Sequence, residues 1–219
     1  IEMEQPKLLA LLSRVTAAVE KRNTIPVLSN VLLQAEGNTL TAIATDLYIE
    51  VTTTADATVI EPGATTVNAA TLQAIVAKLS KGKLVTLTTV KDTLAINSGR
   101  SELELQTLPV EDFPRLASGE YASTFQAEQS QVGRILDLAG FAMSTEETRY
   151  YLNGIYLHSI DGNIRGVSTD GHRLAQIDSD IQADFPGVII PRKSVALIAK
   201  LLDDGDATVS VSETKFRID

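Results

Sequence analysis

The sequence contains no cysteine and no tryptophan, and only two of its 219 residues are histidine. Without cysteine these residues can form no disulfide and no thiolate metal site, and such a composition fits a reducing compartment such as the cytoplasm. The longest apolar runs, such as VALIAKLL at 195–202, are interrupted by lysine and are too short to cross a bilayer. We therefore expect neither a disulfide scaffold nor a membrane partner.

Charge is plentiful but unevenly placed. Apolar residues make up 44% of the chain, enough for a sizeable core, and the net charge of −9 argues against non-specific adhesion of the whole surface to nucleic acid. Two segments, 63–83 and 186–202, nevertheless contain no acid. Their basic residues are Lys78, Lys81, Lys83, Arg192, Lys193 and Lys200. Either segment taken alone is explained by chance and a solvated helix face.

Three stretches of the chain recur at an offset of 124 residues, which indicates an internal duplication. The pairs are 4–18 with 128–142, 30–46 with 153–170, and 61–89 with 185–212. The boundary falls in a stretch rich in proline, glycine and serine at 108–123, which predicts domains at 1–116 and 117–219. The second copy ends near the third-from-last strand of the first. It is expected to be incomplete and to leave a sheet edge exposed.

Both copies have the same pattern of elements: helix, strands, helix, strands. This order predicts an α+β fold in which each domain has two helices packed on antiparallel sheets. The apolar residues expected to face the core from the helices are Leu8, Leu11, Leu12, Val15, Val19, Leu72, Ile75, Val76, Leu79, Val132, Ile135, Leu136, Ala139, Val195, Ile198 and Leu202. Leu47, Ile49 and Val51 alternate and predict a strand.

The stretch TDGHR at 169–173 has the residue types of a catalytic site, because Asp170 precedes His172 by two positions. A general base needs a nucleophile nearby, and none stands in this stretch. The first copy keeps Thr45 and Asp46 at the matching positions but has no histidine. The shared Thr-Asp therefore indicates a structural turn in which the carboxylate caps backbone N–H groups. His158 is interpreted as an ordinary strand residue.

Several motifs together resemble the bacterial beta sliding clamps, the beta subunits of DNA polymerase III. They are IPVLSNVLL, TDLYIEV, PGATTV, SGRSELELQTLP with DFP, RYYLNGIYL, TDGHRLA and IIPRKSV, and they extend over essentially the whole chain. The resemblance implies DNA-clamp domains of the processivity fold. In that family, three domains per chain form a two-chain ring around duplex DNA, without catalytic activity or cofactors. The third domain is absent from this sequence.

The resemblance also implies roles for individual residues. Half of a groove for short linear peptides is implied at Leu152, Thr169, Gly171, His172, Arg173 and Leu174. DNA contacts are implied at Arg22, Arg149, Tyr150, Tyr151, Arg192 and Lys193. The subunit interface of a homodimer is implied at Arg100, Glu102, Leu103 and Leu105. Glu102 stands where a base is expected in some relatives, which predicts a rearranged charge pairing, and Glu146 and Glu147 weaken the case for DNA contact at the neighbouring loop.

The partners implied are double-stranded DNA, the DNA polymerase III alpha subunit, the clamp-loader delta subunit, and other clamp-binding polymerases and repair proteins. A handful of lysines and arginines without a base-reading pattern suits a ring that slides, since attraction to phosphate is independent of sequence. A second hypothesis stays open: a protein-interaction module that has the clamp fold but no role on DNA. An enzyme lacks any supporting set of residues.

Overall fold

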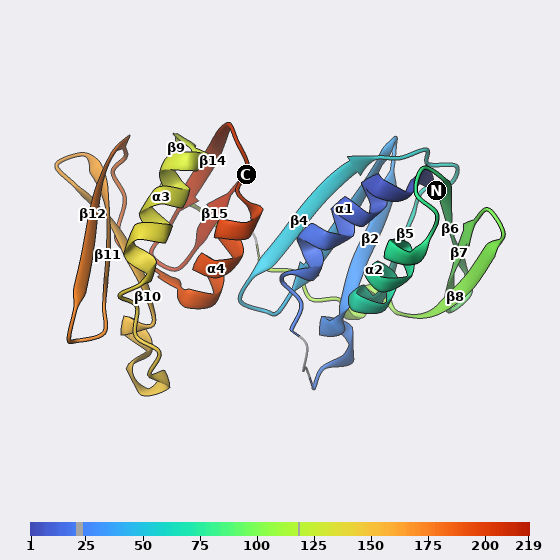
Figure 1. The fold of residues 1–219 in the computed structure, drawn as a ribbon, viewed down its shortest axis with the longest axis horizontal. Coiled ribbons are helices and arrows are strands. Elements are labelled where there is room, and N and C mark those ends of the chain that lie inside the picture. Colours follow the sequence, from blue (N-terminus) through green and yellow to red (C-terminus); the bar gives the residue numbers. More distant parts are fainter. Residues whose placement is uncertain (21–23, 118) are drawn as a thin grey trace. The chain divides into compact units, whose positions relative to one another are not determined.

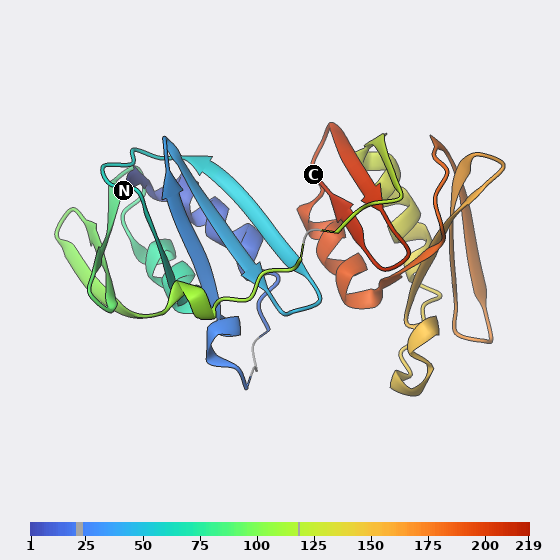
Figure 2. The same cartoon turned by 180° about the vertical axis from the view of Figure 1, so that it is seen from behind.

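The computed structural model describes residues 1–20, 24–117 and 119–219, which divide into two compact units, 1–117 and 118–219. Each unit has two α-helices. Figure 1 shows the helices lying against the strands of their own unit, and Figure 2 shows the strands from the opposite side. In the described part of the chain, no helix is both long and apolar enough to span a membrane.

The strands of unit 1 form one antiparallel sheet in the order β1-β6-β7-β8-β5-β2-β3-β4. Its elements are β1 (Glu2–Glu4), α1 (Gln5–Thr16), η1 (Pro26–Ser29), β2 (Asn30–Glu36), β3 (Thr39–Thr45), β4 (Glu50–Asp56), β5 (Gly63–Asn68), α2 (Ala69–Lys78), β6 (Leu84–Val90), β7 (Thr93–Ser98), β8 (Ser101–Leu108) and η2 (Val110–Asp112). Asn68 caps α2, since its side chain accepts a hydrogen bond from the N–H of Thr71.

Unit 2 has two antiparallel sheets, β12-β11-β10-β13 and β15-β14-β9. Its elements are β9 (Ser123–Glu128), α3 (Gln129–Gly140), η3 (Glu147–Leu152), β10 (Gly154–Ile160), β11 (Asn163–Thr169), β12 (Leu174–Gln182), β13 (Val188–Pro191), α4 (Arg192–Leu201), β14 (Asp206–Val211) and β15 (Phe216–Ile218).

The two units share their element order and their strand pairing, which confirms the predicted duplication and the α+β fold class. The pairs β2·β3, β3·β4, β2·β5, β1·β6 and β6·β7 recur as β10·β11, β11·β12, β10·β13, β9·β14 and β14·β15. Helices α1 and α3 begin 124 residues apart, at Gln5 and Gln129, and α2 and α4 begin 123 apart. Strand β8 joins the two halves of the sheet in unit 1, and it has no counterpart among the described residues of unit 2.

The helical stripes predicted for α1 and α3 are confirmed, because every member that lies within those helices is buried. In α2, Ile75 is only half-buried. Helix α4 buries Leu197, which the pattern did not include, together with Val195, whereas Ile198 is half-buried. Val19 lies beyond the end of α1.

The strand predicted around Leu47 begins later than expected. Leu47 has φ +79° and a 44% exposed side chain, and β4 starts at Glu50. The alternation of Leu47, Ile49 and Val51 therefore does not mark a single strand. The first part of that stretch is the tight connection between β3 and β4.

The segment that follows β8 folds back onto unit 1. Phe113 is buried in a small cluster with Val27, Leu32 and Ile43, and Val110 packs against this cluster. Leu32 and Ile43 are cross-strand partners on β2 and β3, so Phe113 covers a patch of the sheet surface. Beyond it, Arg115 forms two hydrogen bonds of 3.0 Å with the carboxylate of Glu50, which raise the pKa of Arg115.

Candidate peptide-binding turn and nucleic-acid surface

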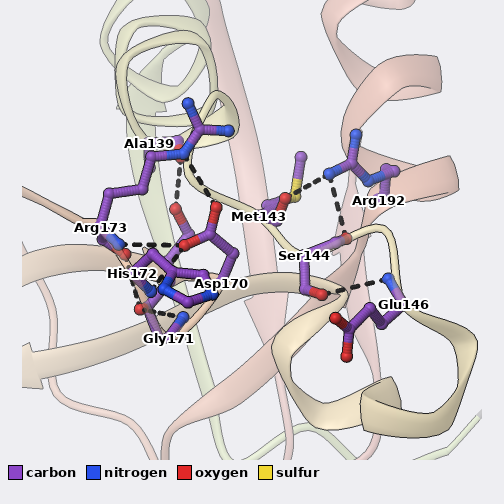
Figure 3. A network of polar contacts seen from close by, with 11 residues as sticks. Ala139, Met143, Ser144, Glu146, Asp170, Gly171, His172, Arg173 and Arg192 are labelled. Carbon is purple, nitrogen blue, oxygen red and sulfur yellow. Dashed lines mark hydrogen bonds and ion pairs between the residues drawn. The ribbon is translucent and has the colours of Figure 1, made fainter.

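The turn between β11 and β12 is built by the side chains of Thr169 and Asp170. Asp170 Oδ1 accepts hydrogen bonds from the backbone N–H groups of His172 (2.9 Å) and Arg173 (3.0 Å). Thr169 Oγ1 accepts from the N–H of Gly171 at 3.1 Å and donates to the carbonyl of Arg173 at 2.7 Å. Gly171 has φ +90°, a conformation that favours glycine. Figure 3 shows the carboxylate of Asp170 facing His172 and Arg173.

The same carboxylate holds the arginine that follows. Asp170 Oδ2 accepts a hydrogen bond from Arg173 Nε at 2.9 Å. Together these contacts lower the pKa of Asp170 to about 2; the backbone N–H of His172 contributes most, and the backbone and side chain of Arg173 follow. Asp170 is therefore a fully ionised structural carboxylate near neutral pH.

Unit 1 repeats this turn almost bond for bond. Asp46 Oδ1 accepts from the backbone N–H groups of Tyr48 (2.9 Å) and Ile49 (2.7 Å), and Thr45 Oγ1 accepts from Leu47 (3.1 Å). Leu47, with φ +79°, occupies the place of Gly171. The prediction that the duplicated Thr-Asp is a backbone-capping turn is confirmed in both copies.

Five of the six residues assigned to the peptide groove are brought together in the unit 2 turn. Leu174 is the first residue of β12, pairs with Thr169 on β11, and is 62% exposed. Leu152 comes from a different element, since it ends η3 and is half-buried. Arg149 of η3 approaches the turn, because a Cβ atom on Gly171 would lie 3.5 Å from Arg149 Nη1.

One aromatic side chain beside the turn was missed by the sequence reasoning. Phe141 follows the C-terminal end of α3, and its ring lies under the guanidinium of Arg173 at 5.5 Å. Phe141 is 60% exposed, so it lies outside the buried stripe of α3 and the periodicity gave no signal for it. The only signal in the sequence that could have identified Phe141 is the presence of a large aromatic residue outside the apolar stripe of the helix.

The residues assigned to DNA contact differ in their surroundings. Tyr150 and Tyr151 are 79% and 55% exposed and meet edge to face at 5.8 Å. Arg149 forms an ion pair with Glu146 at 3.4 Å. Lys193 is exposed on α4. Arg22 lies outside the described residues.

Arg192 makes several hydrogen bonds within unit 2. It is half-buried, its Nη2 donates to the carbonyls of Met143 and Ser144, and its Nε donates to Asn153 at 3.3 Å (Figure 3). Its backbone N–H donates to the carbonyl of Asn153. Arg192 therefore ties the start of α4 to both ends of the segment that contains η3.

The residues assigned to the subunit interface lie at or beside β8. Arg100 is exposed in the turn before the strand, Leu103 is 37% exposed, and Leu105 is half-buried. Strand β8 pairs with β7 from Ser101 to Gln106 and with β5 only at Thr107 and Leu108. Among the described residues, the side of β8 opposite β7 therefore has no strand partner from 101 to 106.

Within 1–20, 24–117 and 119–219, no group of three or more histidine, cysteine, aspartate or glutamate side chains could hold a metal ion. His158 lies on β10, where its ring stacks on Tyr156 at 4.9 Å.

Two copies of a unit with two helices and antiparallel sheets, one after the other in the sequence, define a duplicated clamp-type fold. Models of two protein families match the chain: the N-terminal domain of the DNA polymerase III beta subunit over residues 1–117, and its central domain over 126–219. The chain belongs to the DNA polymerase III beta subunit family.

Named relatives and solved structures agree with this assignment. The chain is 41% identical to the beta sliding clamp of Caulobacter vibrioides over 230 residues, covering all of this chain and 62% of that protein. It is 36% identical to the Escherichia coli beta sliding clamp over 212 residues, covering 95% and 58% of the two chains. A Bartonella birtlesii sliding clamp bound to griselimycin matches with a TM-score of 0.96 at 43% identity, over all of this chain and 61% of that one. The chain thus spans about three fifths of the length of its relatives.

Proposed function

We propose that the full-length protein is a DNA sliding clamp, a processivity factor that encircles duplex DNA and tethers a polymerase without catalysing a reaction. The observation that carries this proposal is the duplicated clamp fold, matched along both of its units by beta-subunit models. Because the relatives are longer, a third domain is proposed to follow these two and to complete a ring of two chains. The proposed location is the cytoplasm.

The proposed DNA-facing residues are the exposed lysines of the acid-free segments, Arg149, Tyr150, Tyr151 and Arg22. Lys78 lies in the last turn of α2, and Lys193 and Lys200 lie on α4; all three are exposed. Each lysine that neutralises a phosphate releases a counterion, so its removal should weaken binding and flatten the salt dependence. Arg192 is proposed to support this surface by holding the start of α4.

The test compares full-length Lys193→Gln, Lys200→Gln with the matched control Lys91→Gln, whose lysine sits on the β6–β7 turn rather than on a helix. The plot of log K against log salt concentration on primed DNA has a negative slope. For the double variant this slope should become less steep by about 2. The control should keep the parent slope. An unchanged slope in the double variant would remove α4 from the DNA surface and favour an interaction module without a DNA role.

The turn at 169–174, together with Leu152, is proposed to form half of a groove for short linear peptides from the polymerase alpha subunit, the clamp-loader delta subunit and other clamp-binding proteins. The exposed Leu174 supports this role, because burying a leucine-sized side chain on binding contributes ~1.5–3 kcal/mol. Fluorescent Gln-Ala-Ala-Leu-Phe should bind the full-length protein and not its Leu174→Asp variant. Equal affinity for the two proteins would exclude Leu174 from the groove.

The free side of β8 is proposed as the subunit interface, with Arg100, Glu102, Leu103 and Leu105. An unpaired strand edge is a template for pairing with another chain, and the exposed Leu103 adds apolar contact. In sedimentation, full-length Leu103→Lys should shift from dimer toward monomer, whereas the same change at exposed Val90, on β6, should leave the dimer intact.

A further inference from the structure

The guanidinium of Arg173 is held from two sides by groups of different chemistry. Its Nε donates to Asp170 Oδ2 at 2.9 Å, and its Cζ lies 5.5 Å from the centre of the Phe141 ring. A cation over an aromatic face is attracted to the ring, and the exposed Phe141 has no place in the core. The first contact holds the Nε edge of the guanidinium, and the second places its central carbon over the ring.

Neither contact is needed to build the turn. Unit 1 makes the same Thr-Asp turn with Ile49 in the position of Arg173, and Ala17 stands 124 residues before Phe141. The carboxylate of Asp46 caps two backbone N–H groups there, as that of Asp170 does here. The Thr-Asp turn therefore forms in unit 1 without an arginine or a phenylalanine at these positions, and unit 2 has both.

The end of α3 is firmly attached to the strand that leads into the turn. Ser168 on β11 donates its hydroxyl to the carbonyl of Ala139. Ile135 of α3 packs so closely on Gly166 of β11 that a Cβ atom there would collide with it. Phe141 is therefore carried on a fixed support and can determine where the guanidinium lies.

The other guanidinium donors of Arg173 point to a use outside the chain. A guanidinium has five N–H donors, and within the described residues only the Nε–H of Arg173 has a hydrogen-bond partner. Its side chain is 57% exposed. The terminal N–H groups of this guanidinium can therefore donate to an acceptor oxygen on a bound peptide. Because the side chain is already ordered, less conformational entropy is lost when the peptide binds.

We infer that Phe141 is a positioning residue of the peptide groove, holding the Arg173 guanidinium so that its terminal N–H groups meet an acceptor oxygen of the docked peptide. This inference rests on the proposed peptide-binding function. It extends the groove to the C-terminal end of α3. It also assigns Arg173 a recognition role that depends on an aromatic face.

The first experiment measures the mobility of the Arg173 side chain in the absence of any peptide. The side chain of Arg173 should show a rigid Nε–H in {1H}-15N NOE measurements on the 219-residue chain. Phe141→Leu should make this group mobile, whereas Phe141→Tyr, which keeps an aromatic face, should not. Because Phe141 is exposed, both variants should keep the parent unfolding temperature. Equal NOE values in all three proteins would overturn the positioning role.

The second experiment uses the full-length protein and the fluorescent Gln-Ala-Ala-Leu-Phe peptide. Phe141→Leu should weaken binding about fivefold, and Phe141→Tyr should restore it. In an Arg173→Ala background, Phe141→Leu should have no further effect, because it acts through the arginine. A fivefold loss that persists in that background would mean that Phe141 contacts the peptide itself, contrary to the inference. If the parent protein fails to bind, the proposed groove is wrong, while the NOE experiment still decides whether Phe141 orients Arg173.

Discussion

Replacing Phe113 by alanine should destabilise unit 1 although this residue lies outside every helix and strand. Phe113 is 6% exposed, and its ring covers Val27, Leu32 and Ile43. Truncating a buried phenylalanine costs about 3–5 kcal/mol, and the small size of this cluster places the expected loss near the lower end, about 3 kcal/mol. Since 1.4 kcal/mol corresponds to a factor of ten, the unfolding equilibrium of unit 1 should shift about a hundredfold.

Hydrogen exchange followed by mass spectrometry measures this shift separately for each unit. Peptides that contain β2 and β3 should lose about two decades of protection where exchange requires unfolding of unit 1. Peptides from β10 and β11 should be unchanged. The matched control is Phe141→Ala, an exposed phenylalanine in unit 2, which should leave both units protected. Unchanged protection of β2 and β3 in the Phe113 variant would refute the argument that this segment is part of the unit 1 core.

Four further predictions concern the two Thr-Asp turns and the start of α4. In Arg173→Ala, the pKa of Asp170 should rise but stay below its ordinary value of 3.8, because backbone N–H bonds are the largest cause of its depression; a carboxyl 13C titration that returns 3.8 would contradict this. Since that pKa is depressed, the stabilisation from Asp170 should be fully present above about pH 4 and lost as pH falls through about 2, a window that thermal melts of the parent and of Asp170→Asn can compare. Asp46→Ala should destabilise unit 1 by about 1–3 kcal/mol in urea unfolding, with Asp46→Asn closer to the parent because its amide oxygen can still accept. Arg192→Ala should raise the protease sensitivity of 143–152, which its guanidinium holds, and Arg192→Lys should rescue this only in part.

The duplication was predictable because a helical stripe and a turn each depend on local spacing. Leu8, Leu11, Leu12 and Val15 recur at the helical period, and packing against a sheet buries all of them. The Thr-Asp turn was predictable for a similar reason, since its carboxylate reaches backbone N–H groups only two and three positions ahead.

Features that depend on contacts distant in the sequence could not be predicted. Phe113 is buried by residues that precede it by seventy positions or more, and Arg192 bonds carbonyls about fifty positions away. The contact between Phe141 and Arg173 likewise joins the end of α3 to the β11–β12 turn, and two strands separate these segments in the sequence. Leu47 was misplaced because an exposed leucine with positive φ is rare, and the alternation rule assigns it to a strand.

The most direct test of the account is topological. The full-length protein should be assembled on a nicked circular plasmid by a clamp loader and then passed through a gel-filtration column in high salt, before and after the plasmid is cut once. A ring held by enclosure rather than by phosphate attraction should co-elute with the circle and leave the linear DNA. Equal retention on both forms, or loss from both, would contradict the claim that these two units belong to a clamp that encircles DNA.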